Sequence, residues 1–274
     1  MDKVVTSIVD RRSAVLDVIR GAKRTLALSL FRCNDTAVFA ELARASARGV
    51  AVDALITSRA KGGKHKLRKL AASLADAGAS VHAYSDPVVK YHAKYLIADD
   101  ALAVVASFNF TRKCFEKTCD ALVLTDDPSV IAGLREVMIA DRAGRRLTAA
   151  ISPRLILGPE LARRQLTALI SQATSSIRLI DAKLSDPDLV ALLNERRAAG
   201  ISVEVFGAKR FGDLKSHGKM LLVDDRVAVV GSLAVAALSL DFRREVAIVV
   251  EEAAAVDEIR QLFATIADNH KVAV

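Results

Sequence analysis

Apolar runs alternate along this chain with segments in which apolar residues recur at helical spacing. Runs such as LALSL, ALAVVAS and VAVVGS predict strands that are buried on both faces of a sheet. The amphipathic segments at residues 36–48 and 185–199 predict helices that pack on such a sheet. Gly49 and Gly200 each stand where a helix would end and a strand begin. The pattern therefore predicts an α/β fold with sheets covered by helices.

The same plan occurs twice. Residues 16–55 and 167–206 both follow the order helix, apolar strand, acidic loop, helix, glycine turn and strand. A second match, YHAKYLIADD with SHGKMLLVDD, lies 125 residues apart, whereas the turn glycines lie 151 apart, so the first half has 26 extra residues between them. The segments KHKLRKLAASLADAG and ASVHAY predict a helix and a strand in this insertion. We therefore expect two homologous α/β halves, residues 1–146 and 147–274, joined near Ala143 to Pro153.

Composition limits the class of protein. The chain has 274 residues, of which 52% are hydrophobic and 26% charged, and this excludes a disordered or collagen-like protein. The longest uncharged stretch, Val227 to Leu240, is too short for a membrane-spanning helix, and the start MDKVVTSIVDRR lacks the apolar segment of a secretory signal. The odd set of Cys33, Cys114 and Cys119 has no CxxC spacing, which favours reduced packing residues over a disulfide scaffold or a zinc site. We expect a soluble, globular, cytoplasmic protein.

Positive charge is concentrated in the first half. Residues 1–149 carry 24 basic and 16 acidic side chains, whereas residues 150–274 carry 16 of each. Six of the basic residues lie between Arg59 and Lys69, in a run without an acid. Such a run is typically a solvated face, and alternatively it attracts a polyanion, either an anionic membrane surface or a nucleic acid. Aromatic residues are few and Trp is absent, which disfavours a platform for stacking the bases of single strands.

One polar motif stands in both halves. It consists of a histidine, a lysine two residues later and an aspartate five residues after the lysine. Because apolar residues fill the motif after the lysine, we expect the histidine and the lysine to lie on a strand, with their side chains on one face. Each half would thus direct one imidazole and one ammonium group the same way. The motif residues are His92, Lys94 and Asp99 in the first half and His217, Lys219 and Asp224 in the second.

Further polar residues follow both motifs at matching distances. A serine follows each histidine at one spacing, and a carboxylate follows it at a second, longer spacing, and both spacings are the same in the two halves. The asparagine that comes shortly after the serine in the first half is replaced by Ala234 in the second half. Two copies with repeated spacings argue against a chance pair of exposed polar sequences. These residues are Ser107, Asn109 and Asp120 in the first half and Ser232 and Glu245 in the second.

These side chains suit the cleavage of a phosphodiester. One imidazole can attack phosphorus and form a covalent phosphohistidine, while the other protonates the leaving oxygen. Histidine titrates near neutrality, so one ring can be neutral while the other is protonated. Lysine, asparagine and serine groups can bind the phosphoryl oxygens as charge develops on them. A carboxylate behind each ring can fix its tautomer by accepting the proton on Nδ1.

With this doubled motif the sequence resembles the phospholipase D superfamily, the HKD phosphodiesterases, over nearly its whole length. The resemblance implies a phospholipase D-like fold in which the two halves pack as a pseudo-dimer with the active site between them. It also implies a two-step reaction through a phosphohistidine, with no metal ion and no other cofactor.

The resemblance also assigns roles to individual residues. His92 and His217 are nucleophile and general acid, and we expect His92 to attack because Asn109 accompanies the first motif. The aspartates of the catalytic motif, Asp99 and Asp224, look structural and set back from the phosphate. The expected phosphate ligands are Lys94, Lys219, Ser107, Asn109 and Ser232, with the acidic residues Asp120 and Glu245 in the second shell of the site.

Three positions depart from the family's pattern. Ala106 stands where the family often has glycine, and Asp120 is shorter than the usual glutamate. Ala234 replaces the second asparagine and removes one phosphate ligand. This last change bears on the efficiency of the second half and leaves both histidines and both lysines in place.

The predicted function is the hydrolysis or transfer of a phosphatidyl or related phosphodiester group, as in phospholipase D or cardiolipin synthase-like members, with phospholipid as the favoured partner. One alternative is a nuclease of the same superfamily that acts on DNA or RNA, which the basic first half supports. Another is a weakly active or inactive member that binds polyanions. The sequence also allows peripheral contact with a membrane through Arg59 to Lys69, and it leaves the oligomeric state open.

Overall fold

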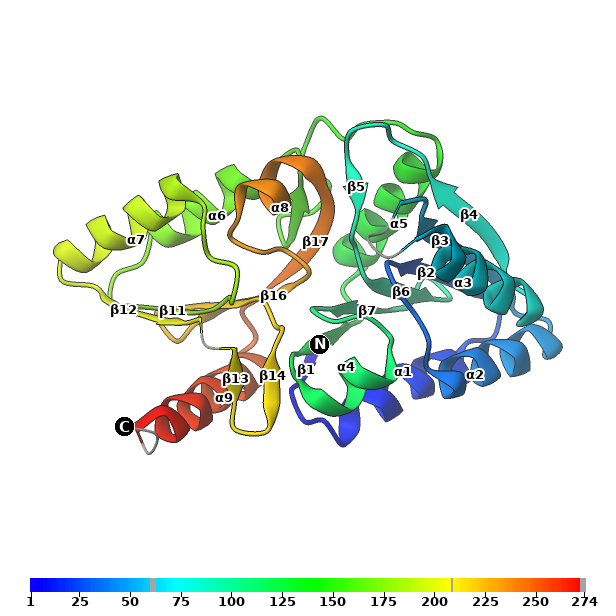
Figure 1. Cartoon of the computed structure of the whole chain (residues 1–274), viewed down its shortest axis with the longest axis horizontal. Helices are drawn as coiled ribbons and strands as arrows, with labels where there is room; N and C mark the ends of the chain where they lie inside the picture. The colour runs from blue at the N-terminus through cyan, green and yellow to red at the C-terminus, as the bar shows by residue number, and fades with distance from the viewer. Residues whose placement is uncertain (60–62, 208, 272–274) are drawn as a thin grey trace.

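The computed structural model describes residues 1–59, 63–207 and 209–271, and it confirms the α/β class. Each half of the chain builds one large mixed sheet, and the two sheets lie side by side with helices around them (Figure 1). In the first sheet β2, β3 and β4 run parallel, and the other neighbouring strands run antiparallel. Its strand order is β1 (Asp2–Val5), β9 (Leu122–Thr125), β7 (Leu102–Ala106), β6 (Tyr95–Ala98), β2 (Thr25–Leu30), β3 (Ala51–Thr57) and β4 (Ser80–Tyr84).

The second sheet repeats the first, apart from one strand at its edge. Among the described residues of the second half, no element corresponds to α3 and β4 of the first half. These two elements are the helix and the strand predicted for the insertion. The strand order is β10 (Leu155–Gly158), β17 (Arg243–Val250), β16 (Val227–Gly231), β15 (Met220–Val223), β11 (Ser176–Ile180) and β12 (Ser202–Phe206).

Three hydrophobic clusters fill the molecule. One lies between the first sheet and α1, α2 and α3, and a second lies between the second sheet and α6, α7 and α8. The third joins the inner faces of both sheets with α5 and α9, so the two halves share one core. The helices are α1 (Asp10–Gly21), α2 (Thr36–Ala47), α3 (Lys64–Asp76), α4 (Arg112–Lys117), α5 (Pro128–Arg142), α6 (Ala162–Ser171), α7 (Pro187–Ala198), α8 (Ala237–Phe242) and α9 (Ala253–Lys271).

Matching residues begin and end the matching helices α2 and α7. The carboxylate of Asp35 accepts hydrogen bonds from the first amides of α2, and the carboxylate of Asp186 does the same for α7. Both are N-cap residues, which satisfy backbone donors that a helix leaves unpaired at its start. After the helices, Gly49 and Gly200 take positive φ values of 87° and 89°, a conformation that favours glycine. The acidic loop and the glycine turn seen in the repeated sequence are thus the two ends of one helix in each half.

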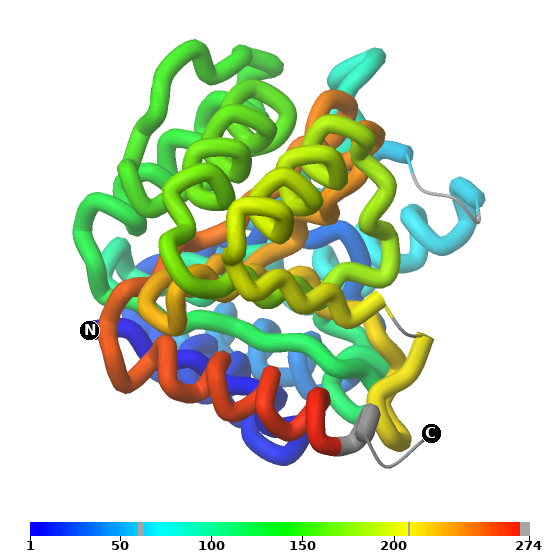
Figure 2. The backbone as a smooth tube through the Cα atoms, turned by 90° about the vertical axis from the view of Figure 1, so that its left-hand side faces the viewer, coloured from blue at the N-terminus to red at the C-terminus, as the bar shows by residue number. Residues whose placement is uncertain are grey.

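Short strands also cross between the halves. β5 (Lys90–Tyr91) of the first half pairs with β17, and β8 (Thr118–Cys119) pairs with β14 (Leu214–Ser216), which in turn pairs with β13 (Arg210–Phe211). The last helix, α9, packs against β1 at the start of the chain, and Figure 2 shows its red coil beside the blue N-terminal segment. The chain passes from the first sheet to the second between α5 and β10, the connection in which the boundary at residue 146 is predicted. The two repeats therefore exchange strands as well as share a core.

The remaining general expectations concern cysteines and membranes. Cys33, Cys114 and Cys119 are free and buried, as predicted for packing residues. Burial raises the pKa of Cys33 and of Cys119 to about 12, so both stay as thiols at neutral pH. None of the described helices is long and apolar enough to cross a bilayer.

Candidate active site

The two motifs lie where the chain passes from one sheet to the other. His92 and Lys94 stand between β5 and β6, and His217 and Lys219 stand between β14 and β15. The prediction that they lie on strands is wrong by a few residues, because each segment changes partners at this point. The amide of His92 donates to the carbonyl of Arg244 in the opposite half, at 2.9 Å. Each motif is therefore anchored to the other half of the molecule immediately before its own strand begins.

Gly218 makes the corresponding crossing of the second motif possible. Its amide donates to the carbonyl of Cys119 in the first half, at 2.8 Å. A Cβ atom at residue 218 would lie 2.7 Å from that carbonyl oxygen, which is closer than real Cβ atoms come. Glycine is therefore required by the close approach of the two halves beside His217.

His92 is held by a carboxylate of the opposite half. Its Nδ1 lies 2.8 Å from Oε2 of Glu245, and the other carboxylate oxygen accepts a hydrogen bond from the hydroxyl of Ser239 at 2.8 Å. The Glu245 side chain is fully buried and the His92 side chain is 14% exposed. The ring of Phe31 packs against the imidazole, with 4.6 Å between the ring centroids. This arrangement fixes the ring and leaves its Nε2 as the atom available for chemistry.

His217 is held in the same crosswise manner. Its Nδ1 lies 3.1 Å from both oxygens of Asp120, which belongs to the first half. Asp120 also accepts a hydrogen bond from the hydroxyl of Ser107 at 2.8 Å. The His217 side chain is 30% exposed, about twice as much as His92. The predicted carboxylate therefore lies behind each ring, but it comes from the other half and not from the repeat that carries the histidine.

Burial and neighbouring charges set the protonation of the first motif. Burial, together with the positive charges of Lys94 and Lys219, lowers the pKa of His92 to about 3 against the opposing effect of Glu245. Burial and the charge of Lys219 lower the pKa of Lys94 to about 7. At neutral pH the His92 imidazole is therefore neutral, which is the form that can act as a nucleophile. Lys219 belongs to the second motif, so its influence on His92 also places the two motifs within electrostatic reach of each other.

The carboxylates behind the rings remain ionised. Burial acts to raise the pKa of Asp120 and of Glu245, but the paired histidine, a nearby lysine and a hydroxyl together more than offset it, and both pKa values lie below their usual range. The two lysines of the motifs also belong to the site. The ammonium groups of Lys94 and Lys219 donate hydrogen bonds to the carbonyls of His92 and His217 respectively. Two buried carboxylates and two buried lysines thus contact the two histidines.

The motif aspartates lie away from this cluster. Asp99 follows β6, and its carboxylate accepts hydrogen bonds from the amides of Lys23, Arg24 and Thr25 at 2.7 to 2.8 Å. Asp224 binds the start of β11 in the same way. Both residues have positive φ in the turn between two strands, with values of 55° and 52°. Their contacts are those of turn residues that tie a strand pair to its neighbour, in line with the expectation that they are structural.

The serines predicted to bind phosphate have other partners. The hydroxyl of Ser107 is fully buried, donates to Asp120 and accepts from the amide of Ala121 at 3.0 Å. The hydroxyl of Ser232 is equally buried and accepts from the amide of Val246 at 3.1 Å. These contacts favour a supporting role behind the site over the direct contact with phosphate that the sequence suggested. Each serine directly follows a strand, β7 or β16, and its hydroxyl bonds to residues of its own half.

Asn109 remains the candidate phosphate ligand among the neutral residues. It lines the cavity beside His217, and its buried Oδ1 has no hydrogen-bond partner among the described residues. At the corresponding place the side chain of Ala234 is buried, and its amide donates to the hydroxyl of Ser239 at 3.0 Å. The second half thus uses this position to brace the serine that supports Glu245.

Two polar residues of the site were missed in the sequence. One is Ser239, which binds Glu245 and corresponds to Cys114 in the repeat, so spacing alone could not reveal it. The other is Lys183, whose pKa is lowered by burial and by the nearby charges of Lys219 and Arg243. Lys183 follows β11 at the place where a basic residue also follows β2. The alignment of the two repeats could therefore have revealed this position.

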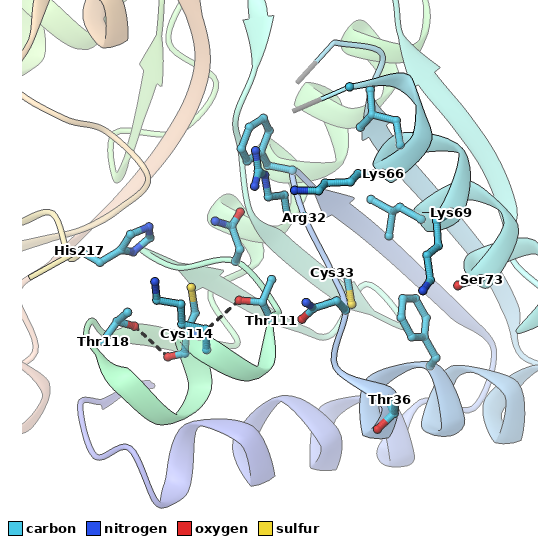
Figure 3. A pocket seen from close by; sticks show the side chains of 18 of the residues that line it. Arg32, Cys33, Thr36, Lys66, Lys69, Ser73, Thr111, Cys114, Thr118 and His217 are labelled. Carbon is cyan, nitrogen blue, oxygen red and sulfur yellow. Dashed lines mark hydrogen bonds between the residues drawn. The ribbon is translucent and has the colours of Figure 1, made fainter. Parts of the chain in front are cut away.

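A cavity of about 730 Å³ opens on the His217 side of the site (Figure 3). It lies between α3, α4 and the connection from β2 to α2, and Figure 3 shows His217 on one side with Lys66 and Lys69 on the other. His92 is not part of its described lining. The lining residues include Phe31, Cys33, Phe39, Lys66, Leu67, Lys69, Leu70, Asn109, Lys113, Cys114, Lys215 and His217.

The predicted basic run from Arg59 to Lys69 divides into parts with different surroundings. The Arg59 guanidinium donates to the carbonyls of Asp86 and Pro87 and so holds the loop before β5. Lys66 and Lys69 line the cavity, and the remaining described basic residues of the run lie outside it. Residues 60–62, which belong to the run, lie outside the described residues.

A metal site was not expected, and metal-free chemistry stays a prediction. Within residues 1–59, 63–207 and 209–271, no three His, Cys, Asp or Glu side chains gather in a way that could hold a metal ion. The direct test is the effect of a chelator on turnover.

Comparisons with known proteins follow the chain through both halves. The profile of the family described as "Cardiolipin synthase, PLD-like domain" matches residues 15–142 and 193–267. A comparison with curated proteins gave no match. Polyphosphate kinase from Porphyromonas gingivalis superposes with a TM-score of 0.75 at 15% identity, over 97% of this chain and 50% of the kinase, so this chain spans about half the length of that protein.

Two further solved structures resemble the chain. Phosphatidylserine synthase from Haemophilus influenzae superposes with a TM-score of 0.75 at 12% identity, over 97% of this chain and 86% of the synthase. Nuc from Salmonella typhimurium, a phospholipase D family member, aligns with 53% of this chain at 25% identity and a TM-score of 0.44, and 93% of Nuc is covered. The likeness to the kinase and the synthase shows that the architecture as a whole, with both halves, is a known one.

Proposed function

The chain belongs to the cardiolipin synthase, PLD-like domain family, and from this premise we propose that it is a phosphodiesterase that works through a phosphohistidine on His92. The observation that carries the proposal is the crosswise support of the two histidines. Each imidazole presents Nδ1 to a buried carboxylate of the opposite half, which leaves its Nε2 for the substrate and supports a single site between the halves. Family membership supports the phosphodiester as the substrate, and the two ring environments support the division of roles.

The first step is nucleophilic substitution at phosphorus. The neutral Nε2 of His92 forms a bond to phosphorus while the bond from phosphorus to the leaving oxygen breaks. His217 gives the proton on its Nε2 to that oxygen, so an alcohol departs. Lys94, Lys219 and Asn109 bind the phosphoryl oxygens as negative charge grows on them.

The second step reverses these roles. Water or an acceptor alcohol enters in the place of the leaving group and gives its proton to Nε2 of His217. Its oxygen bonds to phosphorus while the bond from phosphorus to His92 breaks. Water gives hydrolysis, and an alcohol gives transfer of the phosphatidyl or related group. Glu245 stays ionised beside His92 and stabilises the ring when it carries the phosphoryl group.

A phospholipid is the favoured substrate, as in a phospholipase D or a cardiolipin synthase. The family name supports it, since cardiolipin is a phospholipid. A second candidate is a nuclease reaction on DNA or RNA, which the lysines of the cavity favour. The third candidate is a weakly active protein that binds polyanions. The replacement of a second asparagine by Ala234 favours this candidate.

One assay panel tests the proposal. Purified protein in excess EDTA is offered phosphatidylcholine, phosphatidylglycerol, plasmid DNA and a soluble aryl phosphodiester. We expect turnover of the aryl compound and of a phospholipid, with a phosphohistidine trapped by rapid quenching. Turnover of DNA alone would establish the nuclease instead. Loss of all activity on chelation, or no turnover of any substrate, would contradict the proposed function.

A further inference from the structure

The cavity beside His217 has an unusual balance of charge. Its described lining holds the ammonium groups of Lys66, Lys69, Lys113 and Lys215 and no carboxylate. None of these four ammonium groups has an ion pair or a hydrogen bond with another described residue, whereas the buried cations of the active site do. Like charges around one cavity repel each other, so the binding of an anion there relieves the repulsion and is favourable in free energy.

Part of the lining of the same cavity is apolar. Phe31, Phe39, Leu67 and Leu70 contribute to it, and Leu70 is buried. A volume of about 730 Å³ is within the range that holds a small organic molecule, and it exceeds what a single phosphate group would fill. The occupant that fits is therefore a molecule with an anionic group and a less polar body.

The position of the cavity relates this occupant to the reaction. His217 forms part of its lining and His92 does not. In a substitution at phosphorus the leaving oxygen lies opposite the attacking atom, and the general acid must contact that oxygen. If His92 attacks, the group that departs extends past His217 into the cavity, while the group that stays on phosphorus lies elsewhere.

We propose that the cavity beside His217 binds the leaving group and that this leaving group carries a second phosphate. Lys66 and Lys69 of α3 approach from one side, and Lys113 of α4 and Lys215 of β14 belong to the same lining. This inference rests on the proposed function, and it adds which end of the substrate is selected and by what charge. The same lysines repel a cationic leaving group such as choline, so substrates that release such a group are disfavoured.

Matched soluble substrates test the charge of the leaving group. One phosphodiester has glycerol as the alcohol to be released, a second has glycerol 3-phosphate, and a third carries the added phosphate on the opposite side of the diester. Released alcohols are measured by mass spectrometry, and the mass of the trapped adduct on His92 identifies the group that is retained. We expect kcat/KM for the second substrate to exceed that for the first by about tenfold or more, since each charge-assisted contact has roughly that effect.

A matched pair of variants tests the residues. K66Q/K69Q removes two lysines of the cavity, and K64Q/R68Q removes the same charge from the same helix at positions outside the cavity. The first variant should lose the preference for the phosphorylated leaving group and keep its rate with glycerol. The second should keep both rates. The preference should also decline as salt is raised, because the contacts are ionic.

Each contrary outcome has a definite meaning. Equal rates for the first two substrates in the parent protein would overturn the inference and leave the proposed function intact. A preference for the third substrate would place the added phosphate on the retained group and overturn it as well. Equal loss in both variants would assign the effect to overall charge and overturn the assignment to the cavity. Absence of any adduct with all three substrates would instead contradict the proposed function.

Discussion

His92 and His217 occupy corresponding places in two repeats, yet their surroundings differ. His92 has a single close contact to one oxygen of Glu245, at 2.8 Å, and its side chain is 14% exposed. His217 is shared between both oxygens of Asp120 at 3.1 Å, and its side chain is 30% exposed and lines the cavity. The first ring is enclosed, and the second stands between the enclosed site and the cavity.

This difference shows how a repeated sequence can produce unequal surroundings for the same residue. The motif itself is identical in both halves at histidine, lysine and aspartate. What differs is the neighbourhood: Phe31 packs on His92, and the inserted helix α3, which has no counterpart in the described part of the second half, forms a wall of the cavity. A nucleophile benefits from a neutral, enclosed ring, and a general acid must reach the group that departs. The roles proposed for the two histidines follow from these surroundings.

The largest effects are expected from removing the histidines one at a time. His92→Ala should abolish turnover of every substrate. His217→Ala should cost about 10²-fold to 10⁴-fold with an alkyl leaving group and far less with an activated aryl group, which departs without a proton. Rates with a paired alkyl and aryl phosphodiester measure this difference. A phosphoryl adduct mapped to His217 would reverse the roles proposed for the two histidines. An intact rate in His217→Ala with the alkyl substrate would refute the role of His217 as general acid.

Replacement of the carboxylates should have the next largest effects. Each replacement should impair the histidine of the opposite half. Glu245→Gln should slow formation of the phosphoenzyme with both alkyl and aryl substrates by roughly 10²-fold or more, since His92 loses the group that fixes its tautomer. Asp120→Asn should affect mainly the alkyl substrate, because it acts through His217. Single-turnover rates separate the two. Should Glu245→Gln behave like His217→Ala, the crosswise assignment would be wrong.

A moderate effect is expected at the position where the repeats differ in sequence. Asn109→Ala should lower kcat/KM by about tenfold, the scale of one lost hydrogen bond to a charged group. Ala234→Asn should change it less than a few-fold, since the buried amide at this position supports Ser239 and not the substrate. Steady-state kinetics with the aryl phosphodiester measure both. A large gain from Ala234→Asn would mean that the second half had lost a ligand it can still use.

The smallest effect concerns stability, and it distinguishes Lys94 from an exposed lysine. Burial lowers the pKa of Lys94 to about 7 from the ordinary value of 10.5. Between these pH values the unfolded chain holds a proton that the folded chain has lost, so the free energy of unfolding increases with pH across the window. The penalty of the buried charge is complete below pH 7 and absent above 10.5.

The variant Lys94→Met removes this titration. Its free energy of unfolding should depend less on pH across the window, by roughly 1.4 kcal/mol for each unit by which the pKa is displaced. Urea unfolding at several pH values measures the slope, and Lys117→Met, at an exposed lysine of α4, is the control. An unchanged slope in Lys94→Met would show that the ammonium group is not held in a dry environment.

Much of the architecture was predictable from the sequence because it is local. The apolar runs became the strands, and Gly49 and Gly200 end their helices with positive φ as the repeat suggested. The insertion became α3 and β4, and the doubled motif identified the histidines. Each of these inferences depends on residues that lie close together along the chain, where periodicity and turn chemistry apply.

What the sequence did not reveal depends on contacts between the halves. The sequence predicted a carboxylate behind each ring without saying which one, and the folded chain pairs His92 with Glu245 across the two halves. The family resemblance implied that Ser107 and Ser232 bind phosphate, but both are fully buried and bond to residues of their own halves. The position of Lys66 and Lys69 at a cavity required knowledge of where α3 packs, which the pattern of charges alone does not contain.

The crosswise pairs have a consequence for the time at which the protein becomes reactive. A growing chain that has emerged as far as residue 242 already contains both histidines and lysines, but Glu245 is still missing. Until β17 pairs with β5, His92 has neither its carboxylate nor the carbonyl that holds its amide. Each half supplies the carboxylate that holds the histidine of the other half. The proposed chemistry therefore requires β17 to be in place, and a chain in which this strand has not yet formed lacks the groups that hold His92.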